Sequence, residues 1–419
     1  MKHLNTLISF ITLLSATLHA ADWPQWRGPQ RDARCTETGL LQAWPEKGPP
    51  LAFKITGLGK GFSSVAIAAD KLFTMGDRNG KQCLLAYDLN TQAELWNTST
   101  GRSWTNGPRC TPTIDANRVY ALGAHGDLVC VDADSGKIIW QKNLDQDFGG
   151  KMMSGWGYSE SPLIDDNQLI CTPGVPDALL VALDKNTGQT IWKCVSGDIG
   201  RRGKDGAGYS SPVLSTAVGI RQYVQITGRG CVGVAAKDGR LLWSYNRIAN
   251  GTANIPTPIV HNNFVFCTTS YGTGAALLEL KPTPDGNGVT VHEKYFLKSK
   301  TFQNHHGGVV LLDGCLYAGK GHNRGKPICL DLDTGKIRWE APALGKGSAA
   351  VLYADHRFIF RYDNGLVALL DASPQRCQVI SQFNAGVDRG PKWAHPVIAN
   401  GLLFLRDKNT LLAYNLKKP

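Results

Sequence analysis

One short pattern recurs along the whole chain and limits the folds that this chain can adopt. Its clearest copy runs from Leu128 to Trp140, where an alternating apolar segment leads into Asp-Ala-Asp-Ser-Gly and a second apolar segment ends on tryptophan. Because Gly136 is free to take a positive φ, this copy is expected to form a strand, a tight turn and a second strand. The copies end 44, 52 and 51 residues apart and then after a double interval of 96, at Trp96, Trp140, Trp192, Trp243 and Trp339. Such a period is typical of a propeller or a solenoid, and the all-β unit favours a propeller of four-stranded blades.

The two ends of the repeat region complement each other. Residues 51–55 look like an outer strand, with Phe53 at the tryptophan position, but no inner strands precede them. The missing strands follow at the other end of the chain, in residues 396–405 and 411–414. We therefore predict an all-β chain of eight four-stranded antiparallel blades, closed by an N-terminal strand that joins the last C-terminal blade. The predicted divisions are a signal peptide over 1–20, an extension packed on the propeller over 21–50, and a single propeller over 51–419.

Two motifs resemble known families. The repeat Ala-x-Asp-x-x-Thr-Gly-x-x-x-Trp, seen from Ala182 to Trp192, resembles the tryptophan-docking repeat of quinoprotein-type propellers, whose dehydrogenase members hold pyrroloquinoline quinone (PQQ). The opening Asp22-Trp-Pro-Gln-Trp-Arg-Gly-Pro29 resembles a secreted bacterial group of PQQ-binding-like repeat proteins. A more distant resemblance is to the propeller subunit of the outer-membrane β-barrel assembly machine. The resemblance implies eight blades, with Phe53 and the five repeat tryptophans each packed on the next blade.

The first 20 residues have the features of a signal peptide. Lys2 and His3 precede an apolar run from Leu7 to Leu14, and small residues close the segment at Ala20. The run is too short to span a bilayer as a stop-transfer helix, and no other stretch qualifies as a transmembrane segment. We therefore expect an exported monomer in the periplasm or outside the cell. Export excludes nucleic acid as a partner, although the formal net charge is +11.

The eleven cysteines do not indicate a metal or haem site. Most lie among aliphatic residues and are expected to be small buried apolar groups. Cys315 and Cys329 are placed symmetrically about a turn, so they are expected to lie opposite each other, in position for a disulfide. The neighbours His305 and His306 should point to opposite faces of a strand and are not expected to share an ion, so no metal site is predicted.

The chemistry is expected where the innermost strands begin, because these starts converge on the central channel. The eight starts lie near Phe62, Arg109, Ser159, Tyr209, Ile255, His306, Gly347 and Trp393. Aromatic, imidazole, carboxylate and cationic groups that meet at one mouth are typical of a ligand site. The candidate ligand-binding residues are Arg109, Tyr158, Glu160, Tyr209, Asn254, His305, His306, Lys346, Trp393 and His395.

Two functions fit these residues. The first is a non-catalytic binding or scaffold module that holds an envelope protein or a small polar or glycan ligand and needs no cofactor. The alternative is a PQQ-dependent, Ca²⁺-assisted alcohol or sugar dehydrogenase. The resemblance implies metal-binding oxygens, an Arg and an aromatic ring for such a site, and Glu160, Asn254, Arg109 and Trp393 are of these types. It also implies an Asp base and, in many members, an adjacent Cys-Cys disulfide. Here no Asp stands at the aligned starts and no Cys-Cys pair is present. A fold alone says little about chemistry, so the binding module is preferred.

Overall fold

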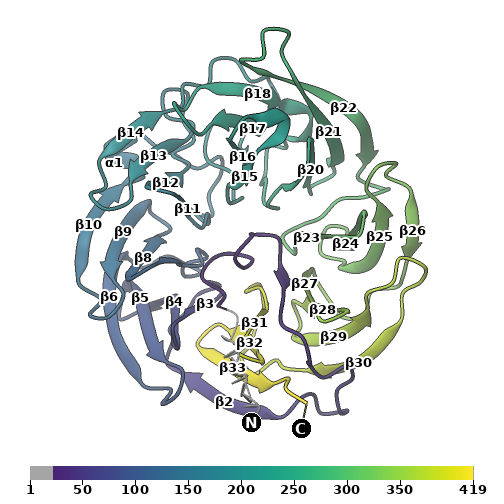
Figure 1. The fold of residues 1–419 in the computed structure, drawn as a ribbon. Coiled ribbons are helices and arrows are strands. Elements are labelled where there is room, and N and C mark those ends of the chain that lie inside the picture. The colour runs from purple at the N-terminus through teal and green to yellow at the C-terminus, as the bar shows by residue number, and fades with distance from the viewer. Residues whose placement is uncertain (1–21, 419) are drawn as a thin grey trace, which may run out of the picture.

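Eight antiparallel sheets stand in a ring around a central axis in a computed structural model, which describes residues 22–418 (Figure 1). The first four blades are β3–β6 (Ala66–Ala68, Lys71–Arg78, Lys81–Asp88, Glu94–Arg102), β7–β10 (Thr113–Asp115, Arg118–Leu122, Asp127–Asp132, Ile138–Asn143), β11–β14 (Leu163–Asp165, Gln168–Cys171, Val181–Asp184, Thr190–Lys193) and β15–β18 (Val213–Ser215, Gln222–Thr227, Gly230–Ala235, Leu241–Tyr245). The next three are β19–β22 (Ile259–His261, Phe264–Thr269, Gly274–Pro282, Val289–Lys298), β23–β26 (Val309–Leu312, Cys315–Lys320, Lys326–Asp331, Ile337–Glu340) and β27–β30 (Ala349–Ala354, Arg357–Tyr362, Leu366–Asp371, Val379–Asn384). The eight-bladed prediction is confirmed.

The eighth blade combines both ends of the chain. Strands β31 (Val397–Ala399), β32 (Leu402–Asp407) and β33 (Thr410–Asn415) supply its inner part. β2 (Leu51–Thr56) pairs antiparallel with β33 as the outer strand, and Phe53 lies opposite Ala413. The predicted closure is therefore confirmed, and the ring is joined by main-chain hydrogen bonds between segments far apart in sequence.

The repeat tryptophans lie against the turn of the following blade. A Cβ atom built on Gly136 would stand 2.5 Å from the Trp96 ring, and one on Gly188 would stand 2.9 Å from Trp140. The indole nitrogens complete the contact, since Trp96 Nε1 donates to the Ala133 carbonyl at 3.1 Å and Trp140 Nε1 to that of Lys185 at 2.9 Å. Glycine in the turn thus gives the aromatic ring of one blade room against the backbone of the next.

Two blades lack the tryptophan and use other groups. In the fifth blade Tyr295 lies against Gly335 and its hydroxyl donates to the Leu332 carbonyl at 2.7 Å. In the seventh blade Ser381 takes the equivalent register, and its hydroxyl oxygen accepts from the Trp44 backbone N–H at 2.8 Å. The Trp44 ring packs edge-on against Phe383 with centroids 5.5 Å apart. The segment before β2 thus supplies an aromatic ring to the seventh blade.

The same segment lies across the axis of the ring before it reaches β2 (Figure 1). Trp23 pairs with Ile67 of the first blade, and β1 (Arg34–Cys35) runs parallel to β27 of the seventh. Between these points Arg31 donates to the carbonyl of Pro212 at 2.7 Å and to that of Ser161 at 3.1 Å. The segment therefore contacts blades on opposite sides of the ring.

Helical structure among the described residues is confined to α1 (Leu144–Phe148) and two 3₁₀ turns, and none of their helices is long and apolar enough to cross a membrane. The expected opposition of Cys315 and Cys329 is wrong. Cys315 faces Asp331 and Cys329 faces Tyr317, because the hairpin register places the two thiols diagonally. All eleven cysteines are free thiols. The predicted signal peptide, residues 1–20, lies outside the described part of the chain.

Candidate functional site

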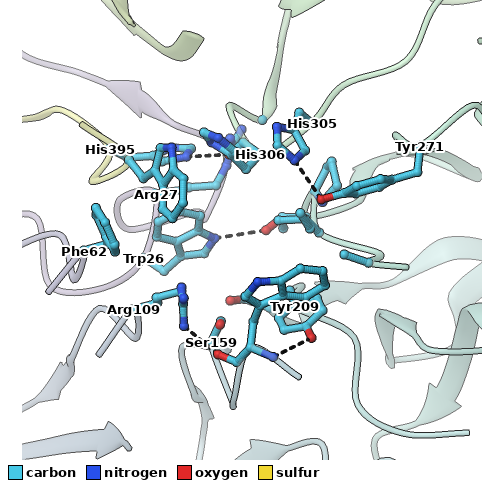
Figure 2. A pocket seen from close by; sticks show the side chains of 18 residues that line it. Trp26, Arg27, Phe62, Arg109, Ser159, Tyr209, Tyr271, His305, His306 and His395 are labelled. Atoms are coloured by element: carbon cyan, nitrogen blue, oxygen red, sulfur yellow. Dashed lines mark hydrogen bonds between the residues drawn. The ribbon is translucent and has the colours of Figure 1, made fainter. Parts of the chain in front are cut away.

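A pocket of about 280 Å³ lies on the axis where the innermost strands begin (Figure 2). The mouth residues predicted from the sequence divide into those that line this axial pocket and those that do not. The lining contains Arg109, Tyr209, His305, His306, Trp393 and His395, together with Phe62. Seven blades contribute to the wall through these and neighbouring residues.

The N-terminal segment supplies lining residues that the sequence analysis did not place in the site. Trp26 and Arg27 both line the axial pocket, and the Trp26 indole N–H donates to the Thr257 hydroxyl oxygen at 3.0 Å. Arg27 is buried and donates to the Asp32 carbonyl at 3.2 Å and to that of Val309, but no residue of the described part of the chain pairs with its Nη1. Burial lowers the pKa of Arg27 to about 10, so it remains charged at neutral pH. The segment was expected to pack on the propeller, but no strand periodicity marks it, so the place of Trp26 and Arg27 in the pocket lining was not predicted.

Aromatic rings form two separate parts of the wall. Phe62 and Trp393 pack with centroids 4.5 Å apart, and Trp156 and Tyr209 lie edge to face at 5.9 Å. Arg109 stands in the blade between these pairs and donates from Nη1 to the Trp156 carbonyl at 2.6 Å. Trp156 is 42% exposed, which is unusual for so large an apolar side chain. The sequence feature that could have identified Trp156 as a lining residue is its position in a Gly-Trp-Gly loop before the third blade.

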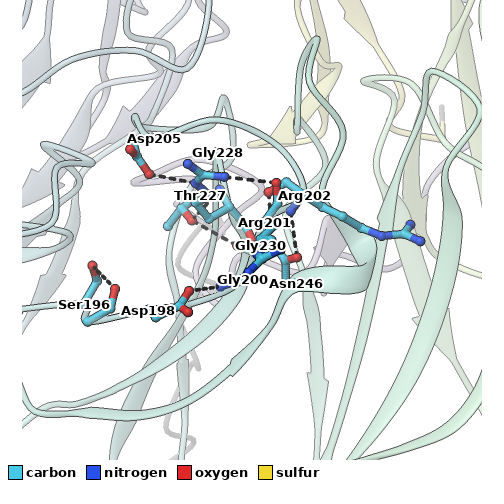
Figure 3. A network of polar contacts seen from close by, with 12 residues as sticks. Ser196, Asp198, Gly200, Arg201, Arg202, Asp205, Thr227, Gly228, Gly230 and Asn246 are labelled. Carbon is cyan, nitrogen blue, oxygen red and sulfur yellow. Dashed lines mark hydrogen bonds and ion pairs between the residues drawn. The ribbon is translucent and has the colours of Figure 1, made fainter.

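A long loop between β14 and β15 leads to Tyr209, and a network of polar contacts holds this loop (Figure 3). Asn246 accepts from the backbone N–H of Arg202 at 2.9 Å and donates to its carbonyl at 3.0 Å. The carboxylate of Asp205 pairs with Arg229 at 2.7 Å. Ala207 then bridges to Met152 on the loop that bears Trp156. The backbone that carries both aromatic rings is therefore held from two blades.

The histidines of the lining are neutral near pH 7. Burial lowers the pKa of His305 to about 4 and that of His395 to about 3, with nearby His322 and Arg27 adding to the effect. Burial also holds the pKa of His306 well below its ordinary value. His395 Nε2 lies 2.9 Å from the His306 carbonyl, so this nitrogen carries the proton, and His305 Nε2 lies 3.0 Å from the Tyr271 hydroxyl. His305 and His395 thus act as neutral hydrogen-bonding groups, whereas no described residue forms a hydrogen bond with the buried Nε2 of His306.

Four of the predicted mouth residues, Tyr158, Glu160, Asn254 and Lys346, do not line the axial pocket. Glu160 is only 2% exposed and accepts from Thr172 N at 3.1 Å and from Gln225 Nε2 at 2.9 Å, so it does not pair with Arg109. Burial raises the pKa of Glu160 to about 8. Asn254 donates to the Thr227 carbonyl at 3.0 Å, Tyr158 donates to that of Pro173 at 3.3 Å, and Lys346 is exposed outside the pocket lining.

The donor set of the axial pocket does not suit Ca²⁺ or a Ca²⁺-supported quinone. Within residues 22–418, no Asp or Glu contributes to its lining, whereas Ca²⁺ prefers carboxylate and carbonyl oxygens. No cluster of three His, Cys, Asp or Glu residues able to hold a metal occurs in that described range. The charged lining side chains are Arg27 and Arg109, which favour an anion.

Eight four-stranded blades closed by an N-terminal strand, with aromatic residues docked between blades, define a quinoprotein-like β-propeller. A family model described as "Outer membrane protein assembly factor BamB" matches residues 80–341, which is more than half of the chain. The chain belongs to this family. A curated relative, the outer membrane protein assembly factor BamB of Kangiella koreensis, is 26% identical over 227 residues. That match spans 50% of this chain and 49% of the relative, so about half the length of each.

Solved structures share the architecture at low sequence identity. BamB from Moraxella catarrhalis superposes with a TM-score of 0.62 at 14% identity and covers 88% of this chain and 99% of its own. A quinohemoprotein alcohol dehydrogenase from Comamonas testosteroni gives a TM-score of 0.66 at 11% identity, with 95% and 81% covered. At these identities the likeness concerns the fold alone. An assembly factor and a dehydrogenase both occur on it, so the site must distinguish between possible functions.

Proposed function

We propose that this protein is an exported, non-catalytic binding module of the bacterial envelope that takes part in outer membrane protein assembly and binds a ligand in its axial pocket. One observation carries the choice of a binding module over a dehydrogenase. The axial pocket has aromatic walls, two arginines and neutral imidazoles, but no carboxylate among its described lining residues. A Ca²⁺-assisted quinone oxidation needs oxygen ligands for the metal and a carboxylate base. Family membership supports the role in assembly.

Reconstitution tests the choice between binding and catalysis. The purified chain is incubated with PQQ and Ca²⁺, and reduction of an artificial electron acceptor is followed with alcohols and sugars as substrates. We expect no reduction beyond that of free PQQ with Ca²⁺. Saturable turnover that requires protein, PQQ and Ca²⁺ together would overturn the proposal in favour of the dehydrogenase.

The assembly role has its own measurement. A tagged copy expressed in its native host should co-purify with the outer-membrane β-barrel assembly machine after mild detergent extraction. An unrelated exported protein with the same tag provides the control. Absence of the machine from the purified fraction, with intact tagged protein present, would remove the assembly role and leave the binding module without this partner.

A further inference from the structure

The two arginines of the axial pocket face aromatic walls, and no described lining carboxylate balances their charge. We propose that this pocket binds a small aromatic carboxylate without a metal ion, with its ring among the aromatic side chains and its anionic group directed by Arg109. The inference rests on the proposed binding role and names the chemical class of the ligand.

Arg27 adds a buried positive charge to the lining of the pocket. Among residues 22–418 its guanidinium donates only to main-chain carbonyls, those of Arg31, Asp32 and Val309, and it forms no ion pair there. Its unpartnered Nη1 lies beside Gly308, which also lines the pocket. A buried charge is costly without a counter-charge, and carbonyl dipoles compensate it only in part. An anion bound in the pocket near Arg27 would balance the rest of its charge.

Arg109 is the group that can reach the anion. It donates from Nη1 to the Trp156 carbonyl at 2.6 Å, and no partner within residues 22–418 takes its Nε or Nη2 protons. It is partly exposed at the rim, between the Phe62–Trp393 pair and the Trp156–Tyr209 pair. A guanidinium with two unused donor atoms suits the two oxygens of a carboxylate.

The hydrogen-bonding state of the wall favours an aromatic ligand over a sugar. The Tyr209 hydroxyl is paired with Ser154 at 2.7 Å, the Tyr271 hydroxyl with His305 at 3.0 Å, and the Trp26 indole N–H with Thr257 at 3.0 Å. A sugar would bury several hydroxyls with few free partners, at a cost for each unmet bond. An aromatic ring needs only ring faces and edges, which the wall provides.

Matched probes test this assignment. The purified propeller chain is titrated in the presence of EDTA with 2-naphthoate, with its neutral analogue 2-naphthamide and with maltose, by calorimetry and tryptophan fluorescence. We expect 2-naphthoate to bind with a Kd below about 1 mM and at least about tenfold more tightly than 2-naphthamide, with no binding of maltose. Affinity for 2-naphthoate should fall as salt rises, whereas affinity for 2-naphthamide should not.

Two arginine variants locate the effect. Arg109→Gln should bring 2-naphthoate and 2-naphthamide to nearly equal affinity. Arg376→Gln removes the same charge from the exposed turn before β30 and should keep the wild-type preference. Thermal unfolding of both variants checks the fold, and the salt dependence of the wild type decides the question if Arg109→Gln does not fold.

Several results would overturn the inference. They are equal binding of acid and amide by the wild type, a preference that survives Arg109→Gln, binding of maltose alone, binding that requires a divalent ion, or no saturable binding at all. None of these depends on the dye-reduction or co-purification results. Failure of the ligand class is therefore distinguishable from failure of the proposed function.

Discussion

Single positions just before an inner strand decide which side chains reach the axis. Ser159 lines the axial pocket, whereas its neighbour Glu160 points into the buried interior beside Thr172 and Gln225. Successive side chains of an extended chain point in opposite directions, so one step in sequence separates a ligand-facing group from an internal one. The sequence pattern located the segments that lead into the inner strands, which themselves begin two to four residues later. It did not show which of two neighbouring side chains faces the axis, which is why Arg109 and Glu160 were grouped together.

Glu160 should make stability depend on pH. Burial raises its pKa from 4.5 to about 8, so folding takes up a proton between these values and wild-type stability falls as the pH rises through them. Glu160→Gln cannot titrate and should lack this fall. Relative to wild type, the variant should therefore gain up to a few kcal/mol between about pH 5 and pH 8, since a tenfold difference in proton affinity between the folded and unfolded protein corresponds to ~1.4 kcal/mol.

Urea unfolding of both proteins at the two pH values measures this gain. Glu46→Gln, which alters an exposed glutamate, serves as the control and should follow the wild type. Parallel pH profiles for wild type and Glu160→Gln would show that Glu160 is ionised in the folded protein and that its burial is compensated.

At the scale of the strand and turn, the interblade contact needs an aromatic ring with a polar tip rather than tryptophan itself. Tyr295 reaches the next blade's carbonyl through its hydroxyl, as Trp96 does through its indole nitrogen. The tryptophan spacing predicted the blades that contain it. It missed Tyr295 because the long β21–β22 hairpin changes the distance from turn to ring.

Trp140 and its neighbour Ile139 provide a matched pair for this contact. Trp140 is 8% exposed and packs on Gly188, whereas Ile139 on the same strand is 43% exposed. Trp140→Ala should lower the free energy of unfolding by about 3–5 kcal/mol, because it removes a large ring and leaves a cavity. Ile139→Ala should change it by less than about 0.5 kcal/mol. Equal losses in urea unfolding would show that the contact does not stabilise the ring of blades.

For the whole molecule, periodicity predicted the ring and its closure but not the path of the N-terminal segment. Trp23 meets the first blade, Arg31 the third and fourth, and Arg34 the seventh. These contacts join residues far apart in sequence, and no local repeat announces them. The candidate site was therefore predicted only in part, because its walls come from the repeats, whereas Trp26 and Arg27 come from the N-terminal segment.

Closure of the ring gives the last prediction. Deleting residues 409–419 removes β33, which is the partner of both β2 and β32. Two sheet edges would be left without a partner strand, and the buried side chains of Leu411 and Leu412 would be missing from the core. The truncated chain should therefore show no cooperative thermal transition and should elute as an expanded or aggregated species in size-exclusion chromatography. Removing only Lys418 and Pro419 leaves every strand intact and should leave the transition unchanged. A monomeric, cooperatively unfolding product of the longer deletion would mean that the other seven blades form a stable ring without the C-terminal strand.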